Sequence, residues 1–424
     1  MMDPLHFLWR RVVWPNWVRI RSNHIARQAE SNYAKLVAKC CNQKETIKVV
    51  FLINESSKWK LEALFNALAR DSRYEPLVLL TCADIDWRLD KDAKKLKLNE
   101  NKDFFDRHGI KYDVAYDYEM DSAIPLSAFH PDVVFYQHPW NIAHNQEPLV
   151  VSRFALTFYV PYFLPTYGIP ELEFCQDFHR CIFRHIVLNK GWKDYYEKYK
   201  GKFLYAGELL PLGHPMLDVY WQKVQKVSCF SNDGWVIYAP HWSIPHPNNQ
   251  NVMNISTFLE TGRPMLEYAL QHPEVKWVFK PHPSLRVVLY RILPRKEVDE
   301  YYAQWERLGK VCYTGDYVDL FFESQALITD SDSFLVEYVF TGKPIIHLKR
   351  DGYNVGSASP LVELFDTYYS TSDANELTTI IDDIVLRHND PQRELRTRVM
   401  KKLGLTDHDV SSSILKSMDS IFFK

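Results

Sequence analysis

Short apolar runs that alternate with amphipathic stretches are the feature that most constrains this chain. In the first half, IKVVFLINES (47–56) precedes KWKLEALFNALARD, where Leu61, Leu64, Phe65 and Leu68 share one helical face. YEPLVLLTC, YDVAY and PDVVFYQHP continue the alternation. Buried strands joined by helices are typical of a parallel sheet. The pattern therefore predicts an α/β domain.

The second half repeats the pattern. Its strand-like runs are WVIYAP (235–240), VKWVFKP (275–281), VCYTG (311–315), ALITD (326–330) and PIIHL (344–348). Because 424 residues exceed what one hydrophobic core usually organises, we expect two Rossmann-like domains. Glycines and prolines between 207 and 215 interrupt both periodicities and mark a boundary. The expected parts are an amphipathic helical extension (1–45), an acceptor domain (46–206), a donor domain (207–390) and C-terminal helices (391–424).

Composition excludes several classes of protein. A formal net charge of −2 argues against a nucleic-acid binder, which usually has a basic excess. The seven cysteines form no CxxC pair, so neither a zinc module nor a disulfide scaffold is indicated, and a reducing cytoplasm fits best. The sequence has no GxxxxGK[ST] loop and no GxSxG elbow. It shows no recognised metal-ligand spacing, and we expect neither a metal nor a cofactor.

The N-terminal segment combines apolar and basic residues. Leu5, Leu8, Trp9, Val12 and Val13 have helical spacing, with arginines between and after them. Two interpretations stand for residues 5–21. The segment lies on the inner face of a membrane as an interfacial helix, or it packs on the protein itself, with Pro15 ending its first part. No run approaches twenty consecutive apolar residues, and no secretory signal is present, so we expect a cytoplasmic or peripheral protein.

Polar residues gather where three predicted strands of the second half end. The clusters are His241 and Ser243, then Lys280, His282, Ser284 and Arg286, then Asp330, Ser331, Asp332 and Ser333. Strand ends of a parallel sheet meet at one edge, where ligands bind. Cationic side chains, hydroxyls and the N–H groups of a helix start all suit phosphate. For ITDSDS (328–333) we expect both a helix cap and a helix start directed at a phosphate.

Four segments resemble the CDP-glycerol glycerophosphotransferase family of teichoic-acid and capsule synthesis. They are GHPMLD (213–218), YAPHWS (238–243), KPHP (280–283) and LITDSDSFLVEY (327–338), and they follow the family's order. The resemblance implies a GT-B fold with the donor in the C-terminal domain and the acceptor in the cleft. It implies transfer of a polyol phosphate from a CDP-polyol to a hydroxyl of a glycan or lipid-linked acceptor, with release of CMP.

The resemblance also assigns residues. His282 matches a histidine that contacts donor phosphate, and Glu337 matches the acidic residue after the loop. The family's Trp-His-Gly segment, whose histidine acts as general base, has no counterpart here. His138 in FYQHPWNIAH is the best substitute, ahead of His144, although His138 could instead only hydrogen-bond across the domain interface. The candidate catalytic residues are thus His138 and His282. The candidate donor-binding residues are His241, Ser243, Lys280, Asp330, Ser331, Asp332, Ser333 and Glu337.

Aromatic residues crowd the region around His138. They are Phe135, Tyr136, Trp140, Phe158, Tyr159, Tyr162, Phe163 and Tyr167. Such clusters usually form core, but prolines interrupt this one, so some of its rings could stack on an acceptor.

Two further functions stay open. One is a GT-B glycosyltransferase that uses a nucleotide sugar in capsule or lipopolysaccharide synthesis, which the missing Trp-His-Gly segment favours. The other is a non-catalytic scaffold of the assembly complex, for which replacement of His282 or Ser333 would leave function unchanged.

Overall fold

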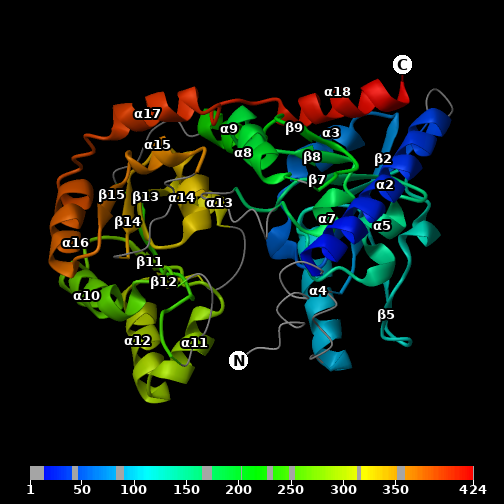
Figure 1. Cartoon of the computed structure of the whole chain (residues 1–424). Helices are drawn as coiled ribbons and strands as arrows, with labels where there is room; N and C mark the ends of the chain where they lie inside the picture. Colours follow the sequence, from blue (N-terminus) through cyan, green and yellow to red (C-terminus); the bar gives the residue numbers. More distant parts are fainter. Residues whose placement is uncertain are drawn as a thin grey trace, which may run out of the picture. The chain divides into compact units, whose positions relative to one another are not determined.

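The fold was analysed in a computed structural model that describes residues 14–40, 46–82, 90–164, 174–201, 203–226, 233–247, 254–312, 317–350 and 359–423. The chain forms two compact units (Figure 1). Unit 1 contains residues 1–163, 169–218 and 408–424, and unit 2 contains residues 164–168 and 219–407.

Unit 1 is built on a parallel sheet. Its described strands are β1 (Ile47–Ile53), β2 (Tyr74–Leu80), β3 (Tyr112–Val114), β6 (Val133–Tyr136), β7 (Leu156–Tyr159), β8 (Arg184–Ile186) and β9 (Glu208–Leu210), in the order β3-β2-β1-β6-β7-β8-β9. A separate hairpin pairs β4 (Tyr116–Asp117) with β5 (Ser122–Ala123). The helices of this unit are α2 (Trp14–Cys40), α3 (Glu62–Ala69), α4 (Lys91–Arg107), α5 (Pro148–Val151), α7 (Asp177–Arg180), α8 (Lys190–Tyr199) and α18 (Val410–Phe422). Helix α9 (Met216–Lys226) begins in unit 1 and continues into unit 2.

Unit 2 has a second parallel sheet. Its described strands are β10 (Trp235–Ala239), β11 (Trp277–Phe279), β12 (Lys310–Val311), β13 (Ser324–Thr329), β14 (Ile345–Leu348) and β15 (Tyr369–Thr371), in the order β12-β11-β10-β13-β14-β15. Its helices are α10 (Phe258–Gln271), α11 (Leu285–Ile292), α12 (Arg295–Leu308), α13 (Val318–Glu323), α14 (Asp332–Val339), α15 (Val362–Phe365), α16 (Ala374–Ile381) and α17 (Arg393–Lys402). The predicted fold class, α/β with two Rossmann-like sheets, is confirmed.

Each sheet has a point where the strand order reverses. In unit 1 the chain leaves β1 toward β2 and β3 and later returns to β6 on the other side of β1. In unit 2 it leaves β10 toward β11 and β12 and later returns to β13. Ligands of open α/β sheets bind outside the carboxyl ends of the strands at such a point. Ligand sites are therefore expected at the carboxyl ends of β1 and β6 in unit 1 and of β10 and β13 in unit 2.

Within unit 1, helix α2 packs against strand β7 and the region of α7. The Tyr33 hydroxyl lies 2.6 Å from Thr157 Oγ1 and donates to the Cys181 carbonyl oxygen at 2.5 Å, and Ser22 donates to Asp177 at 2.6 Å. Pro15 lies in the first turn of α2, where no backbone N–H is needed. Residues 1–13 of the predicted membrane segment lie outside the described residues. Within the described residues, no helix is both long and apolar enough to cross a bilayer.

Candidate functional site

Two histidines and an aspartate meet at the carboxyl edge of the unit 2 sheet. His282 follows β11, His241 follows β10 and Asp330 follows β13, and these three strands are neighbours. The imidazole centroids of His241 and His282 are 5.2 Å apart, and the His241 backbone N–H donates to Asp330 Oδ1 at 2.6 Å. The three predicted strand-end clusters thus come together at the switch point of unit 2.

His241 is held as a neutral hydrogen-bond donor. The backbone N–H of Ser243 donates to its Nδ1 at 3.2 Å, and Ser243 Oγ lies 2.8 Å from the same atom. Since Ser243 Oγ accepts the Ile255 N–H at 3.2 Å, its own proton is available to Nδ1. An Nδ1 that accepts hydrogen bonds leaves the ring proton on Nε2. Among the described residues, that Nε2–H has no acceptor.

His282 repeats the arrangement on the next strand. The Ser284 backbone N–H donates to its Nδ1 at 3.1 Å, so its ring proton is also on Nε2. Within the described part of the chain, this second Nε2–H also has no acceptor. The two His-x-Ser segments, 241–243 and 282–284, thus each present a ring N–H donor, and the two ring centroids are 5.2 Å apart. The sequence shows this repeat, but its significance depends on the adjacency of β10 and β11.

Burial keeps both rings uncharged. It lowers the pKa of His241 to about 3, with a further lowering by His282. Burial lowers the pKa of His282 to about 4, and the Lys280 ammonium acts in the same direction. Both imidazoles are therefore neutral at physiological pH and can donate through Nε2–H without carrying a charge.

Lys280 supplies a cation at the same edge. Its side chain is buried, and Nζ lies 5.1 Å from the centroid of the Tyr317 ring and 5.5 Å from that of Phe334. The Tyr317 hydroxyl donates to Glu337 Oε2 at 2.5 Å. Lys280 and Glu337, both predicted from sequence, thus belong to one cluster, and Tyr317 links them. Arg286, by contrast, forms an ion pair with Asp299 at 2.8 Å.

Helix α14 begins without the side-chain cap that the sequence predicted. Ser331 is the N-cap residue, but its side chain makes no capping hydrogen bond. Its backbone N–H instead donates to Thr329 Oγ1 at 3.0 Å, and Thr329 Oγ1 donates to the Ala239 carbonyl oxygen at 2.6 Å. Asp332 and Ser333 are already the first two helical residues. The predicted side-chain cap is wrong, because Thr329, two residues before Ser331 at the end of β13, holds the loop through its hydroxyl.

Asp330 ties three segments together. Its Oδ2 accepts hydrogen bonds from the Thr257 N–H at 2.7 Å and from the Ser256 hydroxyl at 3.0 Å, while Oδ1 accepts from His241 N–H. Burial raises the pKa of this carboxyl to about 6, although these hydrogen bonds act to lower it. Both carboxyl oxygens already accept hydrogen bonds from within unit 2. Ser256 and Thr257 were missed in the sequence, although polar residues before the apolar start of α10 are a usual sign of a helix start.

We expect Asp330→Ala to lower the free energy of unfolding by about 3–5 kcal/mol, because it leaves several buried donors without an acceptor. Asp330→Asn keeps one carboxamide oxygen and should lose roughly half as much. Urea unfolding followed by circular dichroism measures both. Ser333→Ala is the control, with an expected change below about 0.5 kcal/mol because Ser333 is no cap. A loss for Asp330→Ala no larger than the Ser333→Ala change would show that Asp330 does not support this edge.

His138 in unit 1 has the opposite tautomer. It follows β6 at the switch point of that sheet and is buried. Its Nδ1 lies 2.7 Å from the Trp140 carbonyl oxygen, which can only accept, so Nδ1 carries the proton and Nε2 has a lone pair. Within the described ranges, Nε2 has no hydrogen-bond donor. Burial lowers the pKa of His138 to about 4, and Lys58 contributes to the lowering.

The other histidines of unit 1 have different surroundings. His144 is exposed, and its Nδ1 lies 3.2 Å from Glu147. His214, in the GHPMLD segment, accepts the Met216 N–H on Nδ1 at 3.1 Å, and its Nε2 lies 2.7 Å from the Pro161 carbonyl oxygen. Both ring nitrogens of His214 are thus occupied inside unit 1.

The aromatic cluster near His138 is largely core. Within it, the rings of Phe135 and Phe158 are 5.0 Å apart in the sheet interior, and Tyr136 and Tyr159 are buried too. Phe158 and Tyr159 lie in strand β7, which the sequence did not mark as a strand because prolines follow it closely. Tyr167 lies outside the described residues. In the described part of the chain, no group of three or more His, Cys, Asp or Glu side chains could hold a metal ion.

Comparison with known proteins identifies the fold. The sequence matches no protein-family model and no curated protein. Among solved structures, it is similar to a protein from Listeria monocytogenes assigned as a UDP-N-acetylglucosamine 2-epimerase, with a TM-score of 0.60, 16% identity and coverage of 90% of this chain and 97% of the other. It is also similar to the UDP-GlcNAc 2-epimerase from Neisseria meningitidis bound to UDP-GlcNAc, with a TM-score of 0.55, 12% identity and coverage of 88% and 100%.

A third similar structure is that of S. aureus MnaA with UDP, with a TM-score of 0.55, 13% identity and coverage of 88% of this chain and 96% of the other. At these identities the likeness concerns the fold. These neighbours are GT-B proteins, and the chain therefore has the GT-B fold. The first two of these structures are named as UDP-GlcNAc 2-epimerases and not as glycerophosphotransferases, so the resemblance seen in the sequence is supported for its fold and not for its reaction.

Proposed function

We propose that this chain is an enzyme that acts on a nucleotide-activated sugar, with a UDP-sugar as the first candidate. The observation that carries the proposal is the pair of neutral imidazoles, His241 and His282, which present two Nε2–H donors at neighbouring strand ends. Two phosphate groups in a row offer an acceptor for each of these donors. The three structures that share the fold all have UDP or a UDP-sugar in their names, and two of them hold UDP-GlcNAc or UDP, which supports the choice of nucleotide.

Lys280 and the start of α14 complete the proposed phosphate site. An ammonium group neutralises diphosphate charge, and the first N–H groups of a helix attract anions. Ser331 and Ser333 flank that helix start and add hydroxyl donors. Asp330 and Ser243 position His241, and Glu337 positions Tyr317 beside Lys280. Asp332 is the least suited of the predicted donor-binding residues, because its carboxylate would repel a phosphate that it faced.

His138 is proposed as the general base. Its proton is fixed on Nδ1 by the Trp140 carbonyl oxygen, so Nε2 can accept a proton from a substrate hydroxyl or carbon. The contrast with His241 and His282 is chemical, since the tautomer of a neutral imidazole decides whether Nε2 accepts or donates. One base of this kind serves glycosyl transfer and epimerisation alike.

Transfer of a polyol phosphate from a CDP-polyol is the second candidate. The observation that favours it is the order of GHPMLD, YAPHWS, KPHP and LITDSDSFLVEY along the chain. The same two imidazole donors suit the diphosphate of CDP-glycerol as well as that of a UDP-sugar. The nucleotide product therefore distinguishes the candidates.

A donor panel tests the proposal. We would incubate the whole chain with UDP-GlcNAc, UDP-glucose, CDP-glycerol and CDP-ribitol, with and without a membrane extract as acceptor, and separate the nucleotides. We expect consumption of a UDP-sugar, with released UDP indicating transfer and an isomeric UDP-sugar indicating epimerisation. Release of CMP alone would establish the second candidate. Failure to bind any of the four donors would favour the scaffold interpretation, and His138→Gln serves as the control for chemistry without loss of binding.

A further inference from the structure

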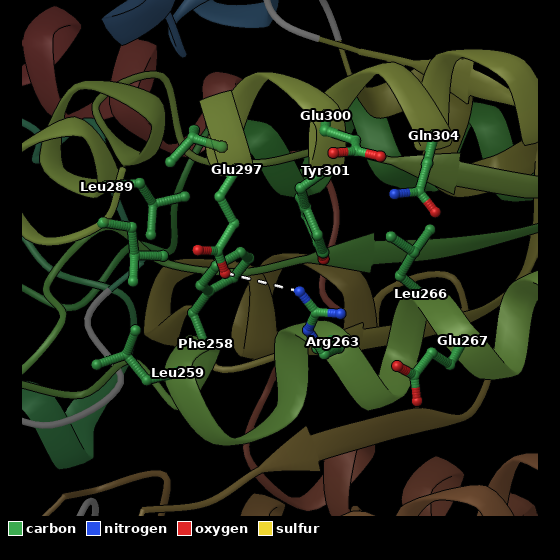
Figure 2. A pocket seen from close by; sticks show the side chains of 12 residues that line it. Phe258, Leu259, Arg263, Leu266, Glu267, Leu289, Glu297, Glu300, Tyr301 and Gln304 are labelled. Carbon is green, nitrogen blue, oxygen red and sulfur yellow. Dashed lines mark ion pairs between the residues drawn. The ribbon is translucent and has the colours of Figure 1, made fainter. Parts of the chain in front are cut away.

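Unit 2 contains a cavity away from the strand ends, between α10, α11 and α12. Its volume is about 360 Å³, in the range of small-molecule sites. Figure 2 shows α10 and α12 on opposite sides, with their side chains directed toward the cavity. The floor is apolar and is formed by Phe258, Leu266, Leu289, Leu293, Val298 and Tyr301.

The rim of the cavity has an excess of negative charge. It carries three carboxylates, on Glu267, Glu297 and Glu300, and one guanidinium, on Arg263. Arg263 pairs with Glu297 at 3.6 Å, as the dashed line in Figure 2 shows. Glu267 and Glu300 form no ion pair with any described residue. An apolar floor beneath a rim that carries more carboxylates than cations is complementary to a ligand with an apolar body and a cationic end.

The cavity is connected to the support of His241. Phe258, which contributes to the floor, directly follows Thr257, whose N–H is bound by Asp330. Two residues earlier, the Ile255 N–H donates to Ser243 Oγ, which in turn lies 2.8 Å from His241 Nδ1. Phe258 therefore adjoins the backbone segment, residues 255–257, whose hydrogen bonds hold Ser243 and Asp330 beside His241.

We propose that this cavity is an effector site for a small amphipathic cation, an amine on an aromatic or alkyl body, and that its occupation shifts the imidazole of His241. The amine lies near Glu267 and Glu300, and the apolar body contacts Phe258 and Leu266. The binding step itself does not depend on which nucleotide the chain uses. It is thus separable from the proposed function.

Three probes of equal shape and different charge test the site. They are phenylbutylamine, phenylbutanol and phenylbutanoate, titrated into the whole chain by calorimetry. For a ligand of this size we expect the amine to bind with a dissociation constant of about 1 mM. The carboxylate should bind at least about tenfold more weakly, and added salt should narrow the difference. Equal binding of all three, or no binding of the amine, would overturn the proposal.

Charge reversal at the rim locates the binding. The double variant Glu267→Lys, Glu300→Lys should lose the preference for the amine, and both positions are exposed, so folding is preserved. Glu260→Lys, an exposed position on the same helix outside the cavity, is the matched control and should bind the amine as the unaltered chain does. If the double variant kept the preference, the cation would bind elsewhere and the site would be refuted.

The coupling has its own readout. In a chain with ¹⁵N-labelled histidine, the ring signals of His241, assigned by comparison with His241→Asn, should shift as phenylbutylamine saturates the cavity. The signals of His214 in unit 1 should stay in place. Binding of the amine without a shift at His241 would overturn the effector part of the proposal.

Discussion

We expect the affinity for UDP to fall by about tenfold to a hundredfold when His282 is replaced by asparagine. A loss of this size corresponds to one hydrogen bond to a charged group. Replacement by glutamine should change it by less than about threefold. An asparagine side chain reaches the position of Nδ1 and can still accept the Ser284 N–H, but it has no group at the position of Nε2. A glutamine side chain reaches farther and places an N–H donor near that position.

This pair of variants separates a binding role from a structural one. Calorimetric titration with UDP gives the affinities, and the midpoint of thermal unfolding shows whether each variant is folded. If Asn and Gln weakened UDP binding equally, Nε2–H would not be the group that contacts the nucleotide. In the unaltered chain, ¹⁵N spectra of the imidazole should show Nδ1 without a proton in both His241 and His282. If the chain bound CDP instead of UDP, the same comparison would apply to CDP.

Much of the fold follows from local pattern. The buried runs of β1, β2, β6, β10, β13 and β14 are apolar on both faces, and sequence alone was sufficient to predict them as parallel strands. Strands β8 and β9 are only three residues long and carry charged residues, Arg184 and Glu208, so no apolar run marks them. The pairing of β8 with β7, and of β9 with β8, depends on tertiary contacts that a local pattern does not contain.

Part of the candidate site could be predicted from the sequence. That His241, His282 and Asp330 lie at one edge follows from the strand ends, because parallel strands end on the same side. The tautomers of the histidines could not be predicted from the sequence, since they depend on which backbone N–H or carbonyl oxygen lies beside each ring. The role of Asp330 was out of reach for the same reason: its partners Ser256 and Thr257 come from a loop 73 and 74 residues away. Burial then decides how far each carboxyl or imidazole departs from its usual pKa.

Acid is expected to unfold this chain steeply, with a midpoint near pH 5. Burial lowers the pKa of seven described histidines, His138, His179, His185, His214, His241, His282 and His347. In the unfolded chain these groups titrate near pH 6.5. Between about pH 6.5 and 4 the unfolded state therefore holds protons that the folded state lacks, so the free energy of unfolding falls as pH falls.

The size of the effect follows from the number of groups. Between about pH 6.5 and 4, each of these histidines lowers the free energy of unfolding by up to about 1.4 kcal/mol per pH unit. Asp330 acts in the opposite direction, because its raised pKa of about 6 lets the folded state bind a proton first. Seven histidines less one carboxyl leave a net uptake of about six protons and a slope of about 8 kcal/mol per pH unit, comparable with the whole stability of a typical domain. Circular dichroism between pH 7.5 and 4 measures the transition.

Two buried histidines of unit 1 provide the matched test of this explanation. Among the described residues, neither ring nitrogen of His179 has a hydrogen-bond partner, whereas both nitrogens of His214 do. His179→Leu should leave stability at pH 7.5 unchanged or raised and should move the acid midpoint to lower pH, because one proton-binding group of the unfolded chain is gone. His214→Leu should lower stability at pH 7.5 by about 1–3 kcal/mol, since it leaves the Met216 N–H and the Pro161 carbonyl oxygen without partners. An acid midpoint that stayed the same in His179→Leu, or a chain still folded at pH 4, would show that the buried imidazoles do not control acid stability.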